Sequence, residues 1–182
     1  MRTFADPLRR GLCVAPRSTA VIDTAAGVTL SFSEFDLRCR SLVGGLAGLG
    51  LRPGDRIALL MANGHPYLES YVALPAAGFV IVPINTRLAD PEIEYILRDA
   101  GARALITDRP PSAVEEAVER VIRVPDEYEN LIASAEPLAE LDPLHAIDEH
   151  DLAGLFYTGG TTGPSKGGML THRNLVANMW NT

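Results

Sequence analysis

The sequence predicts an α/β fold, a layered arrangement in which helices flank a mainly parallel sheet. Two observations support this class. Short apolar runs alternate with segments of helical periodicity, and runs such as Arg56–Ala62 are apolar on both faces, as a sheet covered by helices on both sides requires. The chain has 182 residues, of which 47% are hydrophobic and 21% charged. A chain of this length buries roughly 70% of its unfolded surface, enough for one core.

Two β-branched runs near the N-terminal end predict a small hairpin. They cover Thr19–Asp23 and Val28–Phe32, with a turn-like segment between them. A helix is predicted next, with Ser33 as its N-cap and Asp36 completing an approximate capping box. Apolar residues then recur at spacings of three and four. Cys39 belongs to this stripe, and we interpret it as a small buried hydrophobe.

Strands and helices alternate in the next segment of the chain. Pro75 is expected to kink or shorten the helix that contains it. A second helix has Asp90 as N-cap and Pro91 as its first residue, and Gly101 ends it. The predicted strands are Arg56–Ala62, Phe79–Ile84 and Arg103–Thr107, and the first of the two helices covers Pro66–Ala77.

Residues 108–150 are less regular. The pattern predicts a short helix at Ala113–Glu119 and a strand at Arg120–Val124. The acidic stretch Pro125–His150 is interpreted as a surface connection. Three histidines have no partner at metal-ligand spacing and are expected on the solvated surface, namely His65, His145 and His150.

Composition excludes several classes of protein. The formal charge is −7, from 16 basic and 23 acidic residues, which argues against a nucleic-acid-binding domain. Cys13 and Cys39 lack the spacing of a zinc site or a disulfide framework, and reduced thiols are expected. The N-terminus lacks a secretory signal, and the apolar run Tyr71–Ile84 falls short of the ~20 residues of a membrane span. These features predict a soluble, cytoplasmic protein without a transmembrane segment. Peripheral membrane contact and homo-oligomer formation stay open.

One segment carries groups suited to chemistry. An apolar strand, Leu152–Tyr157, runs into a loop of glycines and threonines that contains Lys166, and Thr171 is the expected N-cap of a following helix. Glycines allow a close backbone approach, successive N–H groups form a concave anion site, and hydroxyls and an ammonium add donors. Together these groups suit a polyphosphate. The candidate phosphate-binding residues are Thr158, Gly159, Gly160, Thr161, Thr162, Gly163 and Lys166.

This segment has two alternative interpretations. A flexible glycine–threonine linker is disfavoured, because linkers rarely concentrate threonine hydroxyls and a lysine between a buried strand and a capped helix. The P-loop of kinases and GTPases fails in detail. Pro164 follows Gly163, the lysine comes three residues after that glycine, and Gly167 stands where Ser or Thr is needed.

The run from Tyr157 to Gly167 resembles the phosphate-binding signature of the adenylate-forming superfamily, which includes acyl-CoA synthetases, luciferases and peptide-synthetase adenylation domains. The resemblance extends over nearly the whole chain from about Ser18, and Thr171, His172 and Asn174 resemble the start of the family's next helix. The upstream segments that carry it are Gly54–Leu60, Gly78–Asn85 and Glu94–Ala102. The departures are Gly159 in place of the commonest serine, Pro164-Ser165 in place of x-Pro, and Gly168 in place of valine.

The resemblance implies a two-step ligase reaction. A carboxylate attacks the α-phosphate of ATP to give an acyl-adenylate and pyrophosphate, and CoA then takes the acyl group. The loop would hold the departing pyrophosphate, with Lys166, Thr161 and Thr162 as catalytic residues. Mg²⁺ is expected to bridge phosphate oxygens, with Thr162, or alternatively Thr161, as a metal ligand. His172 is expected either to touch the substrate or to be satisfied by the backbone.

Members of this family are several hundred residues longer than this chain. Residues 1–182 are therefore expected to be part of the N-terminal domain of a fatty-acid or other organic-acid CoA ligase, with the phosphate loop at 157–167 and the C-terminal remainder absent. The chain alone is predicted to be inactive. The alternative is a truncated, non-catalytic module of the same fold that binds phosphate or a partner.

Overall fold

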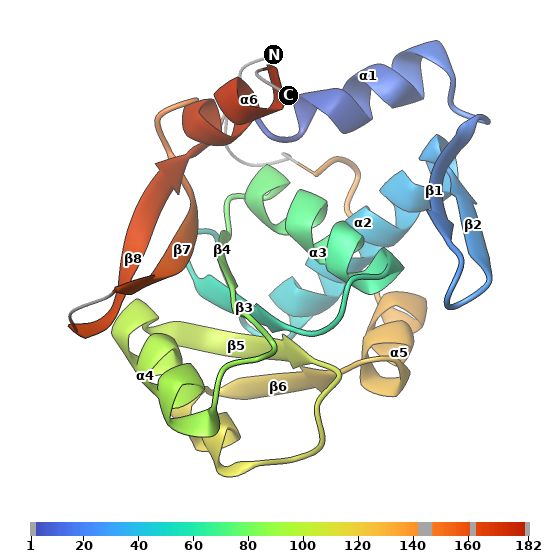
Figure 1. Cartoon of the computed structure of the whole chain (residues 1–182). Coiled ribbons are helices and arrows are strands. Elements are labelled where there is room, and N and C mark those ends of the chain that lie inside the picture. Colours follow the sequence, from blue (N-terminus) through green and yellow to red (C-terminus); the bar gives the residue numbers. More distant parts are fainter. Residues whose placement is uncertain (1–2, 142–146, 161–162, 181–182) are drawn as a thin grey trace.

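The computed structural model describes residues 3–141, 147–160 and 163–180 and confirms the α/β class (Figure 1). The described residues form a six-stranded sheet in the order β6-β5-β3-β4-β7-β8 and a separate two-stranded sheet, β1-β2. The larger sheet is parallel except for β8, which runs antiparallel to β7. The elements are α1 (Asp6–Val14), β1 (Thr19–Asp23), β2 (Val28–Ser31), α2 (Phe32–Gly48), β3 (Arg56–Leu60), α3 (His65–Ala76), β4 (Val80–Pro83), α4 (Asp90–Ala100), β5 (Ala102–Thr107), the 3₁₀ helix η1 (Ala113–Ala117), β6 (Arg120–Arg123), α5 (Asp126–Ser134), β7 (Leu152–Gly160), β8 (Gly163–Thr171) and α6 (His172–Trp180).

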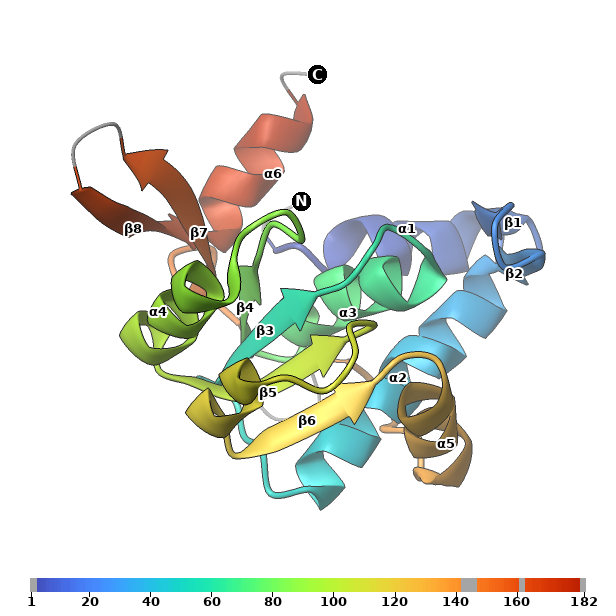
Figure 2. The ribbon, with the colours of Figure 1, turned by 60° about the horizontal axis from the view of Figure 1, so that its bottom comes forward.

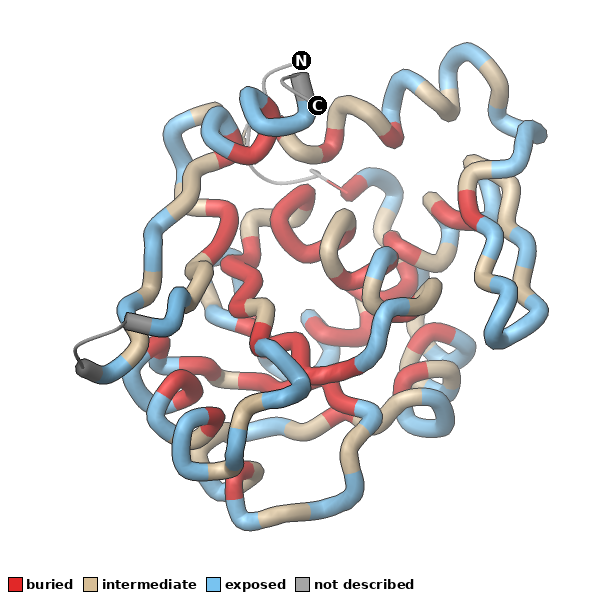
Figure 3. Tube along the Cα trace, in the orientation of Figure 1, coloured by how far each residue is buried: buried red, intermediate tan, exposed pale blue. Residues whose placement is uncertain are grey.

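Both faces of the central strands are buried, as the continuous apolar runs predict. In β3, Ile57 and Leu59 belong to the core shared with α2, α3 and α5, whereas Ala58 and Leu60 pack with α4. Figure 2 shows β3, β5 and β6 side by side, and Figure 3 shows the buried residues concentrated along the strands and on the inner faces of the helices. The sheet therefore separates two apolar layers.

The direction of the chain across the sheet reverses at β3. From β3 the chain passes through α3 to β4, which pairs with one edge of β3. From β4 it passes through α4 to β5, which pairs with the opposite edge of β3. The two helices cover opposite faces, because α3 residues lie in one core cluster and α4 residues in the other. Such a reversal opens a crevice at the carboxyl ends of the two strands, here β3 and β4.

The structure corrects the predicted starts of two helices. Ser31, not Ser33, caps α2: its Oγ accepts from the Glu34 backbone N–H at 3.3 Å, and the Glu34 carboxylate accepts from the Ser31 backbone N–H at 2.8 Å. Glu34 has the reach for a full capping box, which the shorter Asp36 lacks. The N-cap of α4 is Ala89, so that Asp90 is the first helical residue.

The C-terminal ends of α3 and α4 agree with the sequence prediction better than the starts of the helices do. Helix α3 stops at Ala76, directly after Pro75. Gly101 follows α4 with a φ of 62°, in the left-handed region that favours glycine, and ends the helix as predicted.

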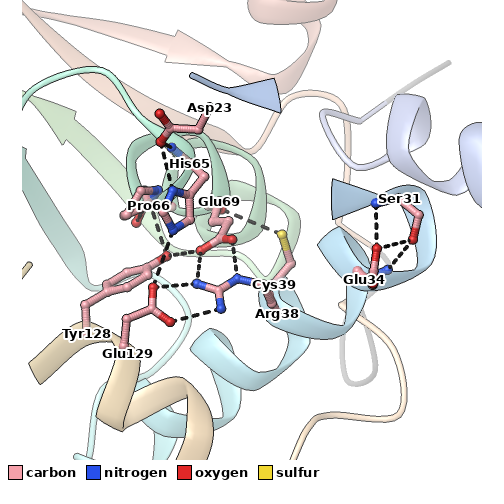
Figure 4. A network of polar contacts seen from close by, with 11 residues as sticks. Asp23, Ser31, Glu34, Arg38, Cys39, His65, Pro66, Glu69, Tyr128 and Glu129 are labelled. Carbon is pink, nitrogen blue, oxygen red and sulfur yellow. Dashed lines mark hydrogen bonds and ion pairs between the residues drawn. The ribbon is translucent and has the colours of Figure 1, made fainter. Parts of the chain in front are cut away.

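The interpretation of Pro125–His150 as a surface connection is wrong for its first part. Residues 126–134 form α5, and Tyr128 is fully buried against the core. Its hydroxyl donates to Glu69 Oε2 at 2.9 Å. Arg38 bridges the buried Glu69 and the partly exposed Glu129, so that charged side chains join α2, α3 and α5 (Figure 4).

His65 is also not a solvated surface residue. Its Nδ1 lies 2.8 Å from Asp23 Oδ2, and its backbone N–H donates to the same carboxylate oxygen at 2.9 Å. His150 is 65% exposed, as expected, and His145 lies outside the described residues. Cys39 is fully buried, and burial raises the pKa of its thiol well above the usual value, which confirms its interpretation as a core residue.

Candidate functional site

The glycine–threonine segment is the outer part of a β-hairpin. Strand β7 continues through Thr158 and Gly159 to Gly160, which pairs with Gly163 at the start of β8. The expectation of a loop beginning at Thr158 is therefore wrong, because ladder hydrogen bonds hold both arms in extended conformation. Thr161 and Thr162 lie outside the described residues.

Gly159 does not use the conformational freedom expected of it. It has no left-handed φ, and a Cβ placed on it would meet no atom within 4 Å. The serine that is commonest at this position of the family would fit the same backbone. The other glycine of interest is Gly167, where a Cβ would lie 2.9 Å from the Tyr157 ring.

The hairpin is attached to the sheet at its base. The pairing between β4 and β7 is Ile81 with Gly154, and beyond it the two arms extend away from the parallel strands (Figure 2). Leu155 and Tyr157 pack against the core on the α4 side, whereas Phe156 packs on the α3 side. The Phe156 and Tyr71 rings meet edge to face, with their centroids 6.5 Å apart. Because successive side chains of β7 point to opposite faces of the sheet, the base of the hairpin packs against both apolar layers.

Thr158 and Lys166 lie directly opposite each other across the hairpin. Both side chains are exposed, and cross-strand neighbours of this kind have Cβ atoms about 5 Å apart on one face. In the part of the chain that the structure describes, Lys166 forms no ion pair. It is also the only lysine in a chain of formal charge −7. The hairpin therefore presents a hydroxyl and a cation side by side, open to an anion from solvent.

A contact missed by sequence reasoning fixes the hairpin beside α4. The Tyr157 hydroxyl donates to Asp99 Oδ2 at 2.6 Å, across 58 positions of sequence. Burial raises the pKa of the Tyr157 phenol, and the Asp99 carboxylate raises it further, so the hydroxyl remains a donor at neutral pH. The sequence carries no signal for this pair, because neither residue belongs to a local motif that names the other.

The helix after the hairpin begins as predicted. Thr171 Oγ1 accepts from the Asn174 backbone N–H at 3.3 Å, and Asn174 Oδ1 accepts from the Thr171 backbone N–H at 3.0 Å. His172 is 1% exposed, and its Nδ1 accepts from the Phe4 backbone N–H at 3.1 Å. The backbone thus satisfies Nδ1 of His172, in line with one of the two expectations for this residue.

A second polar feature lies at the carboxyl ends of β3 and β4. A cavity of about 290 Å³ there is lined by Asn63, Tyr67, Asn85 and Thr86, among others. The Tyr67 ring stacks on the Tyr71 ring, with the two centroids 5.8 Å apart, and Tyr71 in turn contacts Phe156 at the base of the hairpin. Sequence reasoning did not select this crevice, although polar residues directly after two buried parallel strands are the usual signal for one.

The described residues offer neither a preformed metal cluster nor a membrane span. No group of three or more His, Cys, Asp or Glu side chains within residues 3–141, 147–160 and 163–180 could hold a metal ion. Within the same ranges, every helix is too short or too polar to cross a bilayer.

Comparison with known proteins supplies the family. Residues 9–182 match the family described as AMP-binding enzyme. The chain belongs to this family. Among its relatives, a feruloyl-CoA synthase of Amycolatopsis sp is 40% identical over 177 residues, covering 96% of this chain and 34% of the relative. The long-chain-fatty-acid–CoA ligase FadD13 of Mycobacterium tuberculosis is 32% identical over 189 residues, covering 99% of this chain and 37% of the relative.

A solved structure confirms the fold. The fatty acyl CoA synthetase of Mycobacterium tuberculosis superposes with a TM-score of 0.86 at 28% identity, covering 100% of this chain and 37% of that one. The chain thus spans about a third of the length of the relatives it matches. The named relatives act on different acids, so membership of the family leaves the acid unspecified.

Proposed function

We propose that this chain forms the triphosphate-binding part of an ATP-dependent carboxylic acid–CoA ligase. The observation that carries the proposal is the exposed pairing of Thr158 with Lys166 on the hairpin, in a chain that belongs to the AMP-binding family. The acid is proposed to be a fatty acid or another organic acid, consistent with the names of the relatives. A cytoplasmic enzyme of fatty acid metabolism fits this proposal.

The proposed chemistry begins at the α-phosphorus of ATP. A carboxylate oxygen forms a new bond to this phosphorus while the bond to the oxygen bridging the α- and β-phosphates breaks, and that oxygen leaves with pyrophosphate. The Lys166 ammonium and the Thr158 hydroxyl stabilise the charge that develops on the leaving group, with Thr161, Thr162 and the backbone between Gly159 and Gly163 contributing further donors. Losing one preorganised donor of this kind costs roughly 10²–10³-fold in rate.

The second proposed step transfers the acyl group. The thiolate of CoA attacks the acyl carbonyl of the adenylate, a thioester bond forms, and AMP leaves. The polar crevice beside Asn63, Tyr67 and Asn85 is a second place where a substrate can enter, because it opens where the direction of the chain reverses in the sheet.

Among the described residues, no group of three or more His, Cys, Asp or Glu side chains could hold an ion such as Mg²⁺, and the expected ligand Thr162 lies outside those residues. The ion prefers carboxylate and phosphate oxygens in octahedral geometry, and a single threonine hydroxyl such as Thr162 is one neutral ligand.

We further propose that residues 1–182 belong to the N-terminal domain of a longer enzyme, because the chain spans about a third of its relatives. The remaining catalytic groups would then lie outside this sequence. The chain alone is expected to release no pyrophosphate from ATP and a carboxylic acid. Carboxylate-dependent pyrophosphate release by the purified chain would contradict this division.

The proposal is tested with the single lysine. Because Lys166 is the only side-chain amine, an amine-acylating reagent reports on it directly once the α-amino group is blocked. Inorganic pyrophosphate or ATP is expected to slow acylation of Lys166, and Lys166→Ala is expected to abolish pyrophosphate binding measured by calorimetry. The matched control is Arg173→Ala, which removes an exposed cation at the start of α6. Unchanged acylation in saturating pyrophosphate would refute the phosphate site.

A second measurement separates the ligase from a non-catalytic module. In a complete enzyme that contains this sequence, Lys166→Ala should slow acid-dependent exchange of pyrophosphate into ATP. Phosphate binding by the chain combined with no exchange in the complete protein would favour the module.

A further inference from the structure

Tyr157 occupies a special place on the hairpin. It is the residue directly before Thr158 on β7, and its partner across the ladder is Gly167, the residue directly after Lys166 on β8. Beyond Tyr157, no described side chain of either arm forms a hydrogen bond to another element until Thr171 caps α6. The Tyr157 hydroxyl is therefore the outermost polar attachment between the described part of the hairpin and the body of the fold.

The partner of Tyr157 is unusual for its position. Asp99 lies in the last turn of α4, where the helix dipole disfavours a carboxylate. An O–H···O⁻ hydrogen bond of 2.6 Å is the short, charge-assisted type and offsets that cost. Asp99 thus gains a hydrogen-bond donor from outside its own helix, and β7 supplies that donor.

Gly167 makes the same geometry possible from the other arm. A Cβ on Gly167 would lie 2.9 Å from Cζ and 3.2 Å from Oη of Tyr157. The outer end of the tyrosine side chain therefore lies directly against the glycine, and a side chain at that position is expected to displace the hydroxyl from Asp99. The neighbouring Gly168 is different, because a Cβ there would meet the Phe156 carbonyl oxygen at an ordinary 3.4 Å.

We propose that Tyr157 and Asp99 are positioning residues, which tether the hairpin to α4 and so hold Thr158 and Lys166 ready for a phosphate group. The inference rests on the proposed function, since it assigns a purpose to the orientation of those two side chains. The tether acts by restricting the hairpin before a ligand arrives, which reduces the ordering cost of binding.

The test compares hairpin opening with ligand affinity in the 182-residue chain. Tyr157→Phe and Asp99→Ala remove one partner each, and the double variant removes both. The matched controls are Tyr95→Phe, which removes a neighbouring hydroxyl that is no part of the Tyr157–Asp99 hydrogen bond, and Glu94→Gln, which alters an acid of α4 whose partner is Arg98. Hydrogen exchange of the described hairpin amides reports opening, and calorimetry with inorganic pyrophosphate reports affinity.

Each single variant is expected to speed exchange of the hairpin amides about threefold to tenfold, the range for one lost hydrogen bond, while amides of β3 and β5 stay unchanged. Pyrophosphate affinity should fall by a similar factor, and the double variant should be no worse than either single one. Gly167→Ala should reproduce the loss and Gly168→Ala should not. The two controls should behave like the wild type.

Two results would overturn the inference. One is unchanged hairpin exchange in both single variants. The other is faster exchange with unchanged pyrophosphate affinity, which would leave Tyr157 a purely structural role. If the wild-type chain binds no pyrophosphate while the variants still exchange faster, the proposed phosphate site fails and the tether itself stands.

Discussion

Replacing Glu69 by alanine is expected to destabilise the chain strongly, because its carboxylate is fully buried at the centre of a polar network. Oε1 accepts from Arg38 Nε at 2.5 Å, and Oε2 accepts from Arg38 Nη2 at 3.2 Å and from the Tyr128 hydroxyl at 2.9 Å (Figure 4). In the variant, Arg38 keeps Glu129, and the Tyr128 hydroxyl keeps the more distant Pro66 carbonyl at 3.3 Å.

The magnitude follows from burial. Removing one partner of a buried ion pair costs roughly 3–5 kcal/mol. The Arg38 side chain is 22% exposed and retains Glu129, which places the loss at the lower end, about 3 kcal/mol. For a chain of this size that corresponds to a fall in Tm of about 6–12 °C.

Glu129→Ala is the matched control, since it removes a carboxylate from the same arginine. The Glu129 side chain is 39% exposed, so its loss should cost about 1 kcal/mol or less. The assay is urea unfolding followed by circular dichroism, with the free energy of unfolding extrapolated to water at a constant m-value. If Glu129→Ala destabilises the chain as much as Glu69→Ala, burial does not set the strength of this network and the reasoning fails.

Three further predictions concern other parts of the fold. The Asp23 carboxyl has its pKa lowered by hydrogen bonds from His65, so it stabilises the fold above its unfolded pKa of about 3.9 and that contribution disappears as the pH falls further. Asp23→Asn should therefore flatten the acid side of the curve of urea midpoint against pH, and an unchanged curve would contradict this assignment. Gly48→Ala should raise the free energy of unfolding by up to about 1 kcal/mol in the same urea assay, because alanine has less backbone freedom than glycine in the unfolded chain. A Cβ at this position of α2 meets nothing within 4 Å. A lower urea midpoint would show that the site is not open. A thiol reagent should modify the exposed Cys13 at once and Cys39 only in denaturant, and rapid reaction of both thiols would place Cys39 outside the core.

Much of this architecture follows from residues close together in sequence. The N-terminal hairpin, the alternation of strands and helices, the end of α4 at Gly101 and the cap at Thr171 were all predicted and are confirmed. Each depends on side-chain periodicity or on a hydrogen bond within four residues, which a single sequence displays. The resemblance of residues 157–167 to a phosphate-binding signature likewise identified the family before any contact was visible.

Where two local sequence signals compete, only the structure shows which of them applies. Ser31 and Ser33 both precede an acidic residue at a spacing of three, and only the hairpin that ends at Ser31 decides which of them caps α2. Glycines that allow unusual torsions and a close backbone approach predict a loop for these arms. Pairing with β8 instead holds them extended, and a ladder is a property of two segments together.

What the sequence by itself determined is therefore the order of the elements from β1 to β6, the two apolar faces of the sheet and the family. What only the tertiary structure decided is which distant side chains meet: Tyr157 with Asp99, Glu69 with Arg38 and Tyr128, and Asp23 with His65. The physical reason is that periodicity and capping act over one or two turns of chain, whereas these pairs join segments 31 to 59 residues apart. Their partners are chosen by how the layers pack, and no local pattern records that choice.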